Sequence, residues 1–475
     1  MPETPPEPRG HQGGILLRRN YLSAIENVAQ SVGTMGPVAT IGTVLPLLIY
    51  KSGNGTWLLL AGVLVAFALI SASINVFASK IASAGSLATF AQAGLGNWPG
   101  SLTGWSYVIA MTFVVTSSGV SSAYYLSMAV AHFTHVQVGS LGLILLTILV
   151  VLAAWWPSHR DVMLSTKLML GAESLSVLLI VVILGAAMMK THQWFDRSQL
   201  RLEGTSFPHF KLGFVLAFMT LAGFESTTAL GEEAKAATHT LPRVMLLCLL
   251  PTGILFMACC YCLTSLSHGR NLALDQTDAP LDMIAQSVGL PTLGWMSSLG
   301  VAISCFGCAM GGFNAGSRVI FSMARDRHLW RYFEAIHPVN GTPHRALALF
   351  AATAIAVPCA MIAAGVTMAE AMDYLMQIAS FGFLGGYLAV CLAAPFYLAR
   401  SGNFGLVRFA AAGVTVSILG LVFFLSLIPV PDPPWRYLPY IFAGLLAAGM
   451  IVSGRMGAER AAVANPAASG FKSLP

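Results

Sequence analysis

Two carboxylates lie well inside apolar stretches of this 475-residue chain, and they are its best candidates for chemistry. Of the 19 acidic residues, only Glu173 and Glu225 have this position, whereas the others fall in tails, connections or the ends of apolar runs. A carboxylate costs roughly 2.5 kcal/mol or more in hydrocarbon, so each needs a partner or a proton. Both are therefore proton-coupling candidates. In the alternative interpretation, the Glu225 carboxylate accepts hydrogen bonds from backbone amides that the helix break leaves unpaired. Glu173 would then snorkel or face the cytoplasm.

Two apolar stretches also contain residues that interrupt a helix midway. The first carries Gly33, Gly36 and Pro37; glycine permits non-helical backbone, and proline suits the first turn of a restarted helix. The second places Gly223 close to Glu225. Paired broken helices in corresponding positions of two halves indicate the binding site of a secondary transporter. Alternatively, the glycines serve close helix packing or simple kinks.

The elements that carry these residues are predicted to be membrane-spanning helices. The chain is 56% hydrophobic and 9% charged, whereas a soluble domain is about 25% charged. We therefore predict an all-α membrane protein with one membrane domain. A spanning helix needs roughly 20 mostly apolar residues, and about twelve such runs follow one another at 20–50, 56–78, 101–131, 138–156, 163–189, 210–230, 243–266, 294–322, 346–365, 371–398, 407–428 and 436–454.

The distribution of basic residues predicts the orientation. With the N-terminus inside, most of the 25 Lys and Arg residues fall in cytoplasmic segments, as the positive-inside rule requires. We expect a multi-pass cell-membrane protein with both termini cytoplasmic. Residues 1–19 are polar and rich in Pro and Gly, and we expect them to form a disordered cytoplasmic tail. Residues 455–475 are expected to form a second tail.

Several other classes of function find no support in the sequence. The 11 histidines lie in connections or near span ends, and no Ser-His-Asp order, H-E-x-x-H motif or Walker loop is present. The 8 cysteines lie in apolar runs and are interpreted as small apolar residues. The small net charge of +6 lies in connections and does not indicate nucleic acid. We predict no enzymatic activity, cofactor or metal, and transport driven by a gradient or by exchange.

Two motifs resemble a known family. Residues 223–235 read Gly-Phe-Glu followed by the pair Glu232-Glu233, and Pro242-Arg243 comes next. Residues 317–326 contain Ser-Arg and Ala-Arg-Asp, and Thr342-Pro343 follows them. At this spacing in a chain of about twelve spans, the motifs resemble helix 6 and helix 8 of the amino acid–polyamine–organocation (APC) superfamily. The resemblance covers essentially all of residues 20–454.

The resemblance implies amino acid transport by alternating access and a leucine-transporter-type fold. This fold is a five-plus-five inverted repeat. Repeat one would occupy about 20–189 and repeat two about 210–398, with two extra C-terminal helices at about 407–454. The family's usual helix 1 pattern is replaced here by residues 33–38, which leaves the fold expected but the set of amide donors open.

The expected substrate contacts come from the two breaks. A freed half-helix N-terminus offers amide donors to an α-carboxylate, and unwound carbonyls suit an α-ammonium. Phe218 also matches the family's aromatic lid over the substrate, and its alternative role is ordinary apolar packing. The predicted substrate-binding residues are Thr34, Gly36, Val38, Ala39, Phe218, Met219, Leu221 and Gly223.

The coupling ion is predicted to be a proton. The helix 8 face that holds hydroxyl ligands in sodium-coupled relatives offers Cys308 and Gly312 here, with Ser304 a turn away, and soft sulfur suits sodium poorly. The expected partners are an amino acid or related amine, a proton and the lipid bilayer. An exchanger and a transporter of amines or polyamines remain alternatives; a membrane enzyme or a channel fits the sequence least well.

Overall fold

The computed structural model describes residues 16–135, 137–205, 207–267, 272, 279–402, 405–428 and 432–464, and most of them are helical. The helices, with 3-10 helices marked η, are α1 (Ala24–Met35), α2 (Pro37–Ser52), η1 (Gly53–Gly55), α3 (Thr56–Ala78), α4 (Leu87–Leu95), α5 (Asn97–Thr134), α6 (Ser140–Arg160), α7 (Val162–Thr191), α8 (Arg197–Leu200), α9 (Phe207–Phe218), η2 (Met219–Leu221), η3 (Phe224–Leu230), α10 (Ala237–Ser267), α11 (Pro280–Ser287), α12 (Pro291–Arg325), η4 (Arg331–Glu334), α13 (His344–Ala363), α14 (Met368–Arg400), α15 (Leu406–Leu425), η5 (Trp435–Tyr437) and α16 (Leu438–Ala464).

Eleven segments of the described chain are long and apolar enough to cross a membrane. The first, Ala24–Ala78, has 55 residues and contains the two spans predicted at 20–50 and 56–78. The count falls below the predicted twelve because η1 joins α2 to α3 without a gap. The described residues form no strand, and their only isolated bridge joins Leu22 to Ala234. The predicted all-α membrane class is therefore confirmed.

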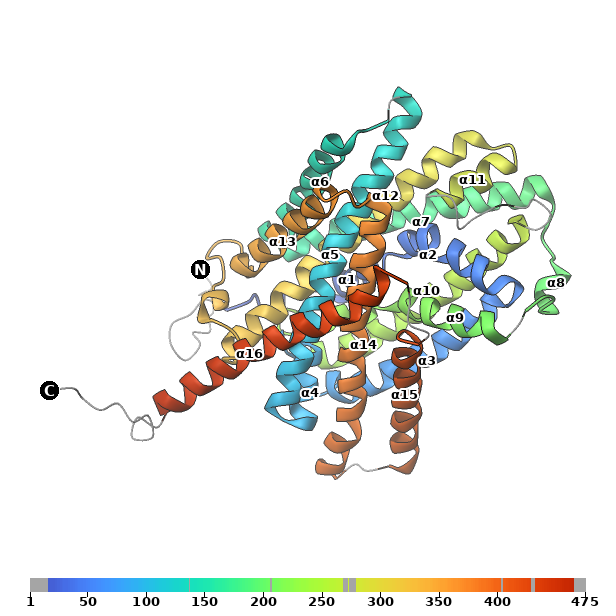
Figure 1. The fold of residues 1–475 in the computed structure, drawn as a ribbon. Coiled ribbons are helices and arrows are strands. Elements are labelled where there is room, and N and C mark those ends of the chain that lie inside the picture. The colour runs from blue at the N-terminus through green and yellow to red at the C-terminus, as the bar shows by residue number, and fades with distance from the viewer. Residues whose placement is uncertain are drawn as a thin grey trace, which may run out of the picture.

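Two long helices, α5 and α12, lie at the centre of the bundle (Figure 1). They pack against each other, and α12 also contacts α1, α2 and α7 while α5 contacts α14. Nearly all of α12 from Ser297 onward is buried. Residues on α12 can therefore reach both of the segments that the sequence predicts to be broken.

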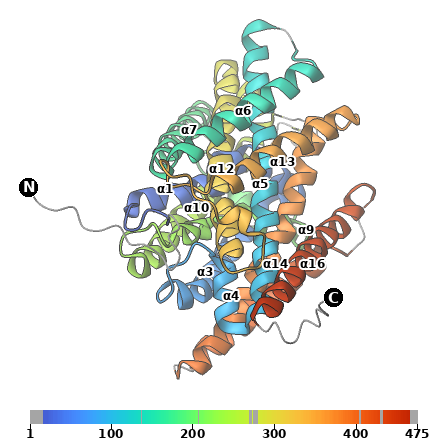
Figure 2. The same ribbon diagram turned by 90° about the vertical axis from the view of Figure 1, so that its left-hand side faces the viewer.

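The outer helices present apolar side chains outward. In Figure 2, α7 and α16 lie on opposite sides of the bundle. Leu178 on α7 is 60% exposed, and Val407 on α15 is 82% exposed. Such side chains are costly in water but normal in contact with lipid tails. The outward face of the bundle thus agrees with the apolar composition.

The two predicted tails lie mostly outside the described residues. The described part of the N-terminal segment is packed: Leu17 is buried, and Arg18 forms an ion pair with Asp161 at 3.1 Å. At the other end, α16 continues past residue 454 to Ala464. Residues 1–15 and 465–475 belong to the parts that the structure does not describe.

Candidate substrate site

The first predicted break is a single left-handed residue between two α-helices. α1 ends at Met35, Gly36 has φ 55° and ψ 66°, and α2 begins at Pro37. The Gly36 amide donates back to the carbonyls of Val32 (3.1 Å) and Gly33 (3.2 Å). Glycine adopts this conformation at little cost. Proline is tolerated at the first helical position because the amide hydrogen that it lacks would have no partner within the helix. The interruption predicted at Gly36 and Pro37 is confirmed.

The second predicted break is longer. α9 ends at Phe218, the short η2 follows, and Ala222 is extended. Gly223 then turns into the left-handed region with φ 95°, and the chain continues as η3 instead of an α-helix. The Gly223 amide donates to the hydroxyl of Tyr387 on α14 at 3.1 Å. This break is therefore confirmed as well, and a side chain from another helix satisfies its backbone.

The two breaks touch each other. A Cβ placed on Gly223 would lie 3.0 Å from Cγ2 and 3.3 Å from the carbonyl oxygen of Thr34. The Ser226 hydroxyl donates to Oγ1 of Thr34 at 2.9 Å, and the Ser31 hydroxyl donates to the carbonyl of Phe224 at 2.8 Å. Two segments 190 or so residues apart in the chain thus form one polar region inside the bundle.

Glu225 lies fully buried in this region. Its Oε2 accepts a hydrogen bond from the Tyr387 hydroxyl at 2.5 Å, so Tyr387 serves both the carboxylate and the Gly223 amide. Its Oε1 makes no close hydrogen bond among the described residues, and neither does the buried Tyr107 hydroxyl, which lies beside the Glu225 carboxylate. Sequence reasoning missed Tyr387. The available signal was a tyrosine in the apolar span 371–398, because a buried phenol usually finds a partner.

Glu173 lies near the first break. It is only 3% exposed, which excludes the interpretation that it faces the cytoplasm. The Ser304 hydroxyl on α12 lies 3.0 Å from both oxygens of the Glu173 carboxylate. The same hydroxyl accepts the amide of Ala39, in the first turn of α2, at 3.1 Å. The structure thus brings Glu173 and Ala39 together through one hydroxyl, at the first of the two breaks.

The remaining predicted substrate residues have varied surroundings. Val38 and Leu221 are buried among apolar side chains, and Met219 is half-buried. The Phe218 ring is buried and packs on Phe67 with ring centres 4.8 Å apart. The Thr34 carbonyl accepts from the Cys308 thiol at 3.1 Å. These contacts leave substrate binding by all eight residues a prediction.

A shallow surface depression is lined by residues of α2, α5, α11 and α12 that include Gly42, Tyr125, Asp282 and Ser298. None of the residues of either break lines it. At the breaks themselves, the Ala39 amide donates to Ser304, the Gly223 amide donates to Tyr387, and the Thr34 carbonyl accepts from Cys308. No group of three His, Cys, Asp or Glu side chains in the described residues is arranged to hold a metal ion.

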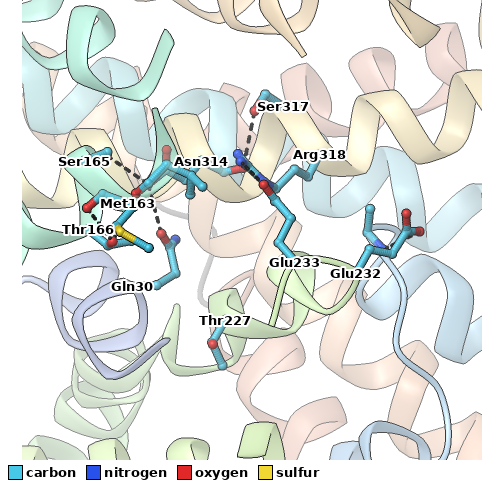
Figure 3. A network of polar contacts seen from close by, with 12 residues as sticks. Gln30, Met163, Ser165, Thr166, Thr227, Glu232, Glu233, Asn314, Ser317 and Arg318 are labelled. Carbon is cyan, nitrogen blue, oxygen red and sulfur yellow. Dashed lines mark hydrogen bonds and ion pairs between the residues drawn. The ribbon is translucent and has the colours of Figure 1, made fainter. Parts of the chain in front are cut away.

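A buried ion pair extends this polar region along α12 (Figure 3). Arg318 is 0% and Glu233 1% exposed; Nε and Nη2 of the arginine donate to the two carboxylate oxygens, the second at 3.1 Å. Arg318 Nη1 donates to the Asn314 carbonyl, and Asn314 Nδ2 donates to Gln30 Oε1 at 3.1 Å and to Ser165 Oγ at 3.0 Å. The network joins α1, α7, α12 and the chain after η3.

The sequence does not indicate that these two residues pair. Arg318 lies near the end of one apolar run and Glu233 just after another, yet both are buried against each other. The neighbouring Glu232 pairs with Arg325, which is 32% exposed. Burial alone would raise the pKa of Glu232, but the hydrogen bond and charge of Arg325 lower it overall. Two successive carboxylates are thus held by two arginines of α12.

The N-terminal segment is attached to the same place. The amides of Tyr21 and Leu22 donate to the Glu233 carbonyl at 2.7 and 2.9 Å, and the Lys235 amide donates to the Leu22 carbonyl at 2.8 Å. Arg18 and the Tyr21 hydroxyl both bond Asp161 at the start of α7. The chain after the second break is therefore fixed from two sides.

An all-helical bundle with eleven apolar segments and two apposed helix breaks defines a multi-pass membrane protein of the transporter class. The family model for amino acid permeases matches residues 22–451, and the chain belongs to this family. The resemblance to the APC superfamily seen in the sequence is thereby confirmed, and the protein is a transporter by family.

Several relatives support this assignment. The branched-chain amino acid permease BcaP of Bacillus subtilis is 23% identical over 82% of this chain and 85% of its own length. An uncharacterized transporter of Mycobacterium tuberculosis is 25% identical over 69% of this chain and 71% of its own. A mitochondrial cationic amino acid transporter of Arabidopsis thaliana is 27% identical, but over only 27% of this chain and 22% of its own.

Proposed function

We propose that the protein is a proton-coupled symporter of neutral, apolar amino acids that works by alternating access in the cell membrane. The observation that carries this proposal is the contact between the two breaks at Thr34 and Gly223. The first break offers amide donors at the start of α2, and the second offers carbonyls around Met219 and Leu221. This pair of ends is complementary to the carboxylate and ammonium of an amino acid.

The proposed membrane topology has twelve crossings. A helical segment of 55 residues, such as Ala24–Ala78, would be about 80 Å long at 1.5 Å per residue, whereas the hydrocarbon core is about 30 Å thick. This segment therefore crosses twice, with the turn at η1. Twelve crossings put both termini on the same side of the membrane, and the distribution of basic residues favours the cytoplasmic side. The breaks then occupy the first helix of each of two inverted five-helix repeats.

Proton coupling is supported by two buried carboxylates that have no cationic partner among the described residues. Glu173 receives the Ser304 hydroxyl, and Glu225 receives the Tyr387 hydroxyl and lies beside the Tyr107 hydroxyl, so neither carboxylate meets a charged side chain in the described part of the chain. An ionised carboxylate in such surroundings is expensive unless it is paired, so a proton is the least costly neutralising ion. The thiol of Cys308 bonds Thr34 close to the first break, where a hard sodium ion would prefer oxygen ligands.

A neutral substrate is favoured by the side chains near the first break. Val115 and Val114 on α5 lie against Gly312, and Met169 lies against Gly33. A cationic amino acid or an amine is the second candidate, because the Glu225 carboxylate has no cationic partner within the described chain and could receive a second ammonium.

The test is uptake into proteoliposomes containing the purified protein. We expect radiolabelled leucine, isoleucine or valine to accumulate when the outside is acidified, and a sodium gradient to have no effect. Arginine and putrescine in the same assay test the second candidate. Sodium-dependent uptake that ignores the pH gradient would overturn the coupling assignment, and no uptake of any amino acid would overturn the substrate class.

A further inference from the structure

The Ser304 hydroxyl lies between two groups that the proposed function assigns to different ligands. On one side, it is 3.0 Å from both oxygens of Glu173, the candidate proton carrier. On the other, it is 3.1 Å from the amide nitrogen of Ala39, which belongs to the proposed carboxylate-binding end of α2. Ser304 is itself fully buried on α12, so water does not compete for these bonds.

The hydrogen count of this hydroxyl decides what it can do. A serine hydroxyl has one hydrogen to donate and two lone pairs that accept. The Ala39 amide uses one lone pair, and an ionised Glu173 takes the only hydrogen. A substrate carboxylate at the start of α2 then meets a serine oxygen without a hydrogen to give, because the Ala39 amide already donates its hydrogen to that oxygen. Behind the serine lies a second negative charge.

Protonation of Glu173 reverses this arrangement. The carboxyl then donates its own hydrogen to Ser304, and the serine hydrogen becomes free to turn toward the start of α2. The residue before this helix, Gly36, has no side chain to cap it, and Pro37 has no amide hydrogen. A donor added there strengthens the binding of an anion.

We propose that Ser304 is the positioning residue that couples the proton on Glu173 to the substrate carboxylate at the start of α2. One proton enters from outside, forms the O–H bond of the Glu173 carboxyl, and returns to water on the cytoplasmic side once the substrate has left. No other bond is made or broken. This inference rests on the proposed function and specifies how its two ligands communicate.

Among the residues that the structure describes, no charged side chain bonds Glu173 and could neutralise it in place of a proton. The thiols of Cys305 and Cys308 face it from α12, and the Cys308 thiol donates to Thr34. The other titratable or charged side chains on the helices packed against α7 form no ion pair with Glu173 in the described chain; they include Glu26, Lys51, His159, Arg160, His239, Arg243, Arg318 and Arg325.

The experiment measures leucine binding to the purified full-length protein at pH 5.5 and pH 7.5. In the wild type we expect tighter binding at pH 5.5, by a factor of about 5 to 150, which is the usual range of coupling between two sites. In Ser304→Ala the ratio should fall below about threefold, with weaker binding at pH 5.5. Ser304→Thr keeps the hydroxyl and should restore the ratio. Ser297→Ala, which removes a hydroxyl bonded within α12 itself, should behave as the wild type.

Two further results separate this inference from the proposed function. Glu173→Gln mimics the protonated carboxyl, so its binding should be tight at both pH values only while Ser304 is present. If wild-type uptake responds to pH but Ser304→Ala keeps the full pH ratio in binding, the role of Ser304 is refuted and proton symport stands. If neither binding nor uptake by the wild type responds to pH, proton coupling itself is refuted, and this inference with it.

Discussion

The backbone at the break after α1 is hydrogen-bonded within its own helix, whereas the backbone at the break before η3 is hydrogen-bonded to a side chain of a distant helix. Gly36 returns its amide to carbonyls of its own α1, and two α-helices resume on either side of it. Gly223 gives its amide to Tyr387, 164 residues away, and 3-10 turns flank it. The first break is therefore a local property of a short sequence, and the second exists only in the folded bundle.

The two breaks are also held in place by different interactions. The chain after Gly223 is fixed to α12 by two ion pairs, one fully buried and one partly exposed. The start of α2 has no such pair and receives only the hydroxyl of Ser304. We therefore expect the second break to tolerate substitutions in its supporting residues less well than the first.

The largest expected effect comes from Arg318→Met. Removing one partner of a buried ion pair leaves an uncompensated charge, which typically costs about 3 to 5 kcal/mol. We expect a large fall in the melting temperature of the purified protein, with partial recovery in the double variant Arg318→Met with Glu233→Met. The matched control is Arg325→Met, which breaks a partly exposed pair worth about 1 kcal/mol or less. Equal losses in the two single variants would contradict the difference in burial.

The next effect compares the two glycines directly. Alanine in the left-handed region costs roughly 1 to 2 kcal/mol at either site. At Gly36 the added Cβ meets neighbours no nearer than 3.4 Å, whereas at Gly223 it meets Thr34 at 3.0 Å. We expect Gly223→Ala to lower stability and uptake more than Gly36→Ala does.

A second-site variant checks the cause of that difference. Thr34→Ser removes the methyl group that the new Cβ would meet, so it should return part of the stability lost in Gly223→Ala. If Gly36→Ala proves the more damaging substitution, the first break is the more constrained of the two.

A smaller effect is expected from Tyr387→Phe. The variant leaves the Gly223 amide and Glu225 without a hydroxyl, at a cost of about 1 to 3 kcal/mol. Hydrogen exchange should accelerate at the Gly223 amide and stay unchanged at the Gly36 amide. Tyr397→Phe, on the same helix and packed on Phe77, serves as the control. Unchanged exchange at Gly223 would mean that its amide has another partner.

The smallest effect concerns the pH dependence of stability from Glu232. Arg325 lowers the pKa of this carboxyl in the folded protein below its ordinary value of 4.5. The unfolded state then binds the proton more readily, so this stabilisation is present above pH 4.5 and is lost as the pH falls through the folded pKa. In Glu232→Gln the melting temperature should fall less steeply below pH 4.5 than in the wild type. Identical slopes would show that Glu232 does not contribute.

The sequence was sufficient to predict features that depend on local chemistry. A glycine followed by a proline can interrupt a helix wherever it stands, so the break at Gly36 was predictable, and the carboxyl of Glu225 marked the second. Partners that come from elsewhere in the chain were not predictable. Tyr387 gives no signal of its acceptor, and Arg318 near the end of an apolar run resembles a cytoplasmic arginine until Glu233, 85 residues earlier, is placed against it.

The burial of Arg318 has a consequence for how the chain enters the membrane. An arginine inside a spanning helix opposes insertion into the bilayer, and α12 carries Arg318 two turns before its last residue, Arg325. Because synthesis runs from the N-terminus, Glu233 has already left the ribosome when α12 arrives. Because Glu233 precedes Arg318 in the chain, the carboxylate can be present in the membrane before the arginine enters it. A nascent chain without Glu233 should therefore retain α12 less efficiently in the bilayer.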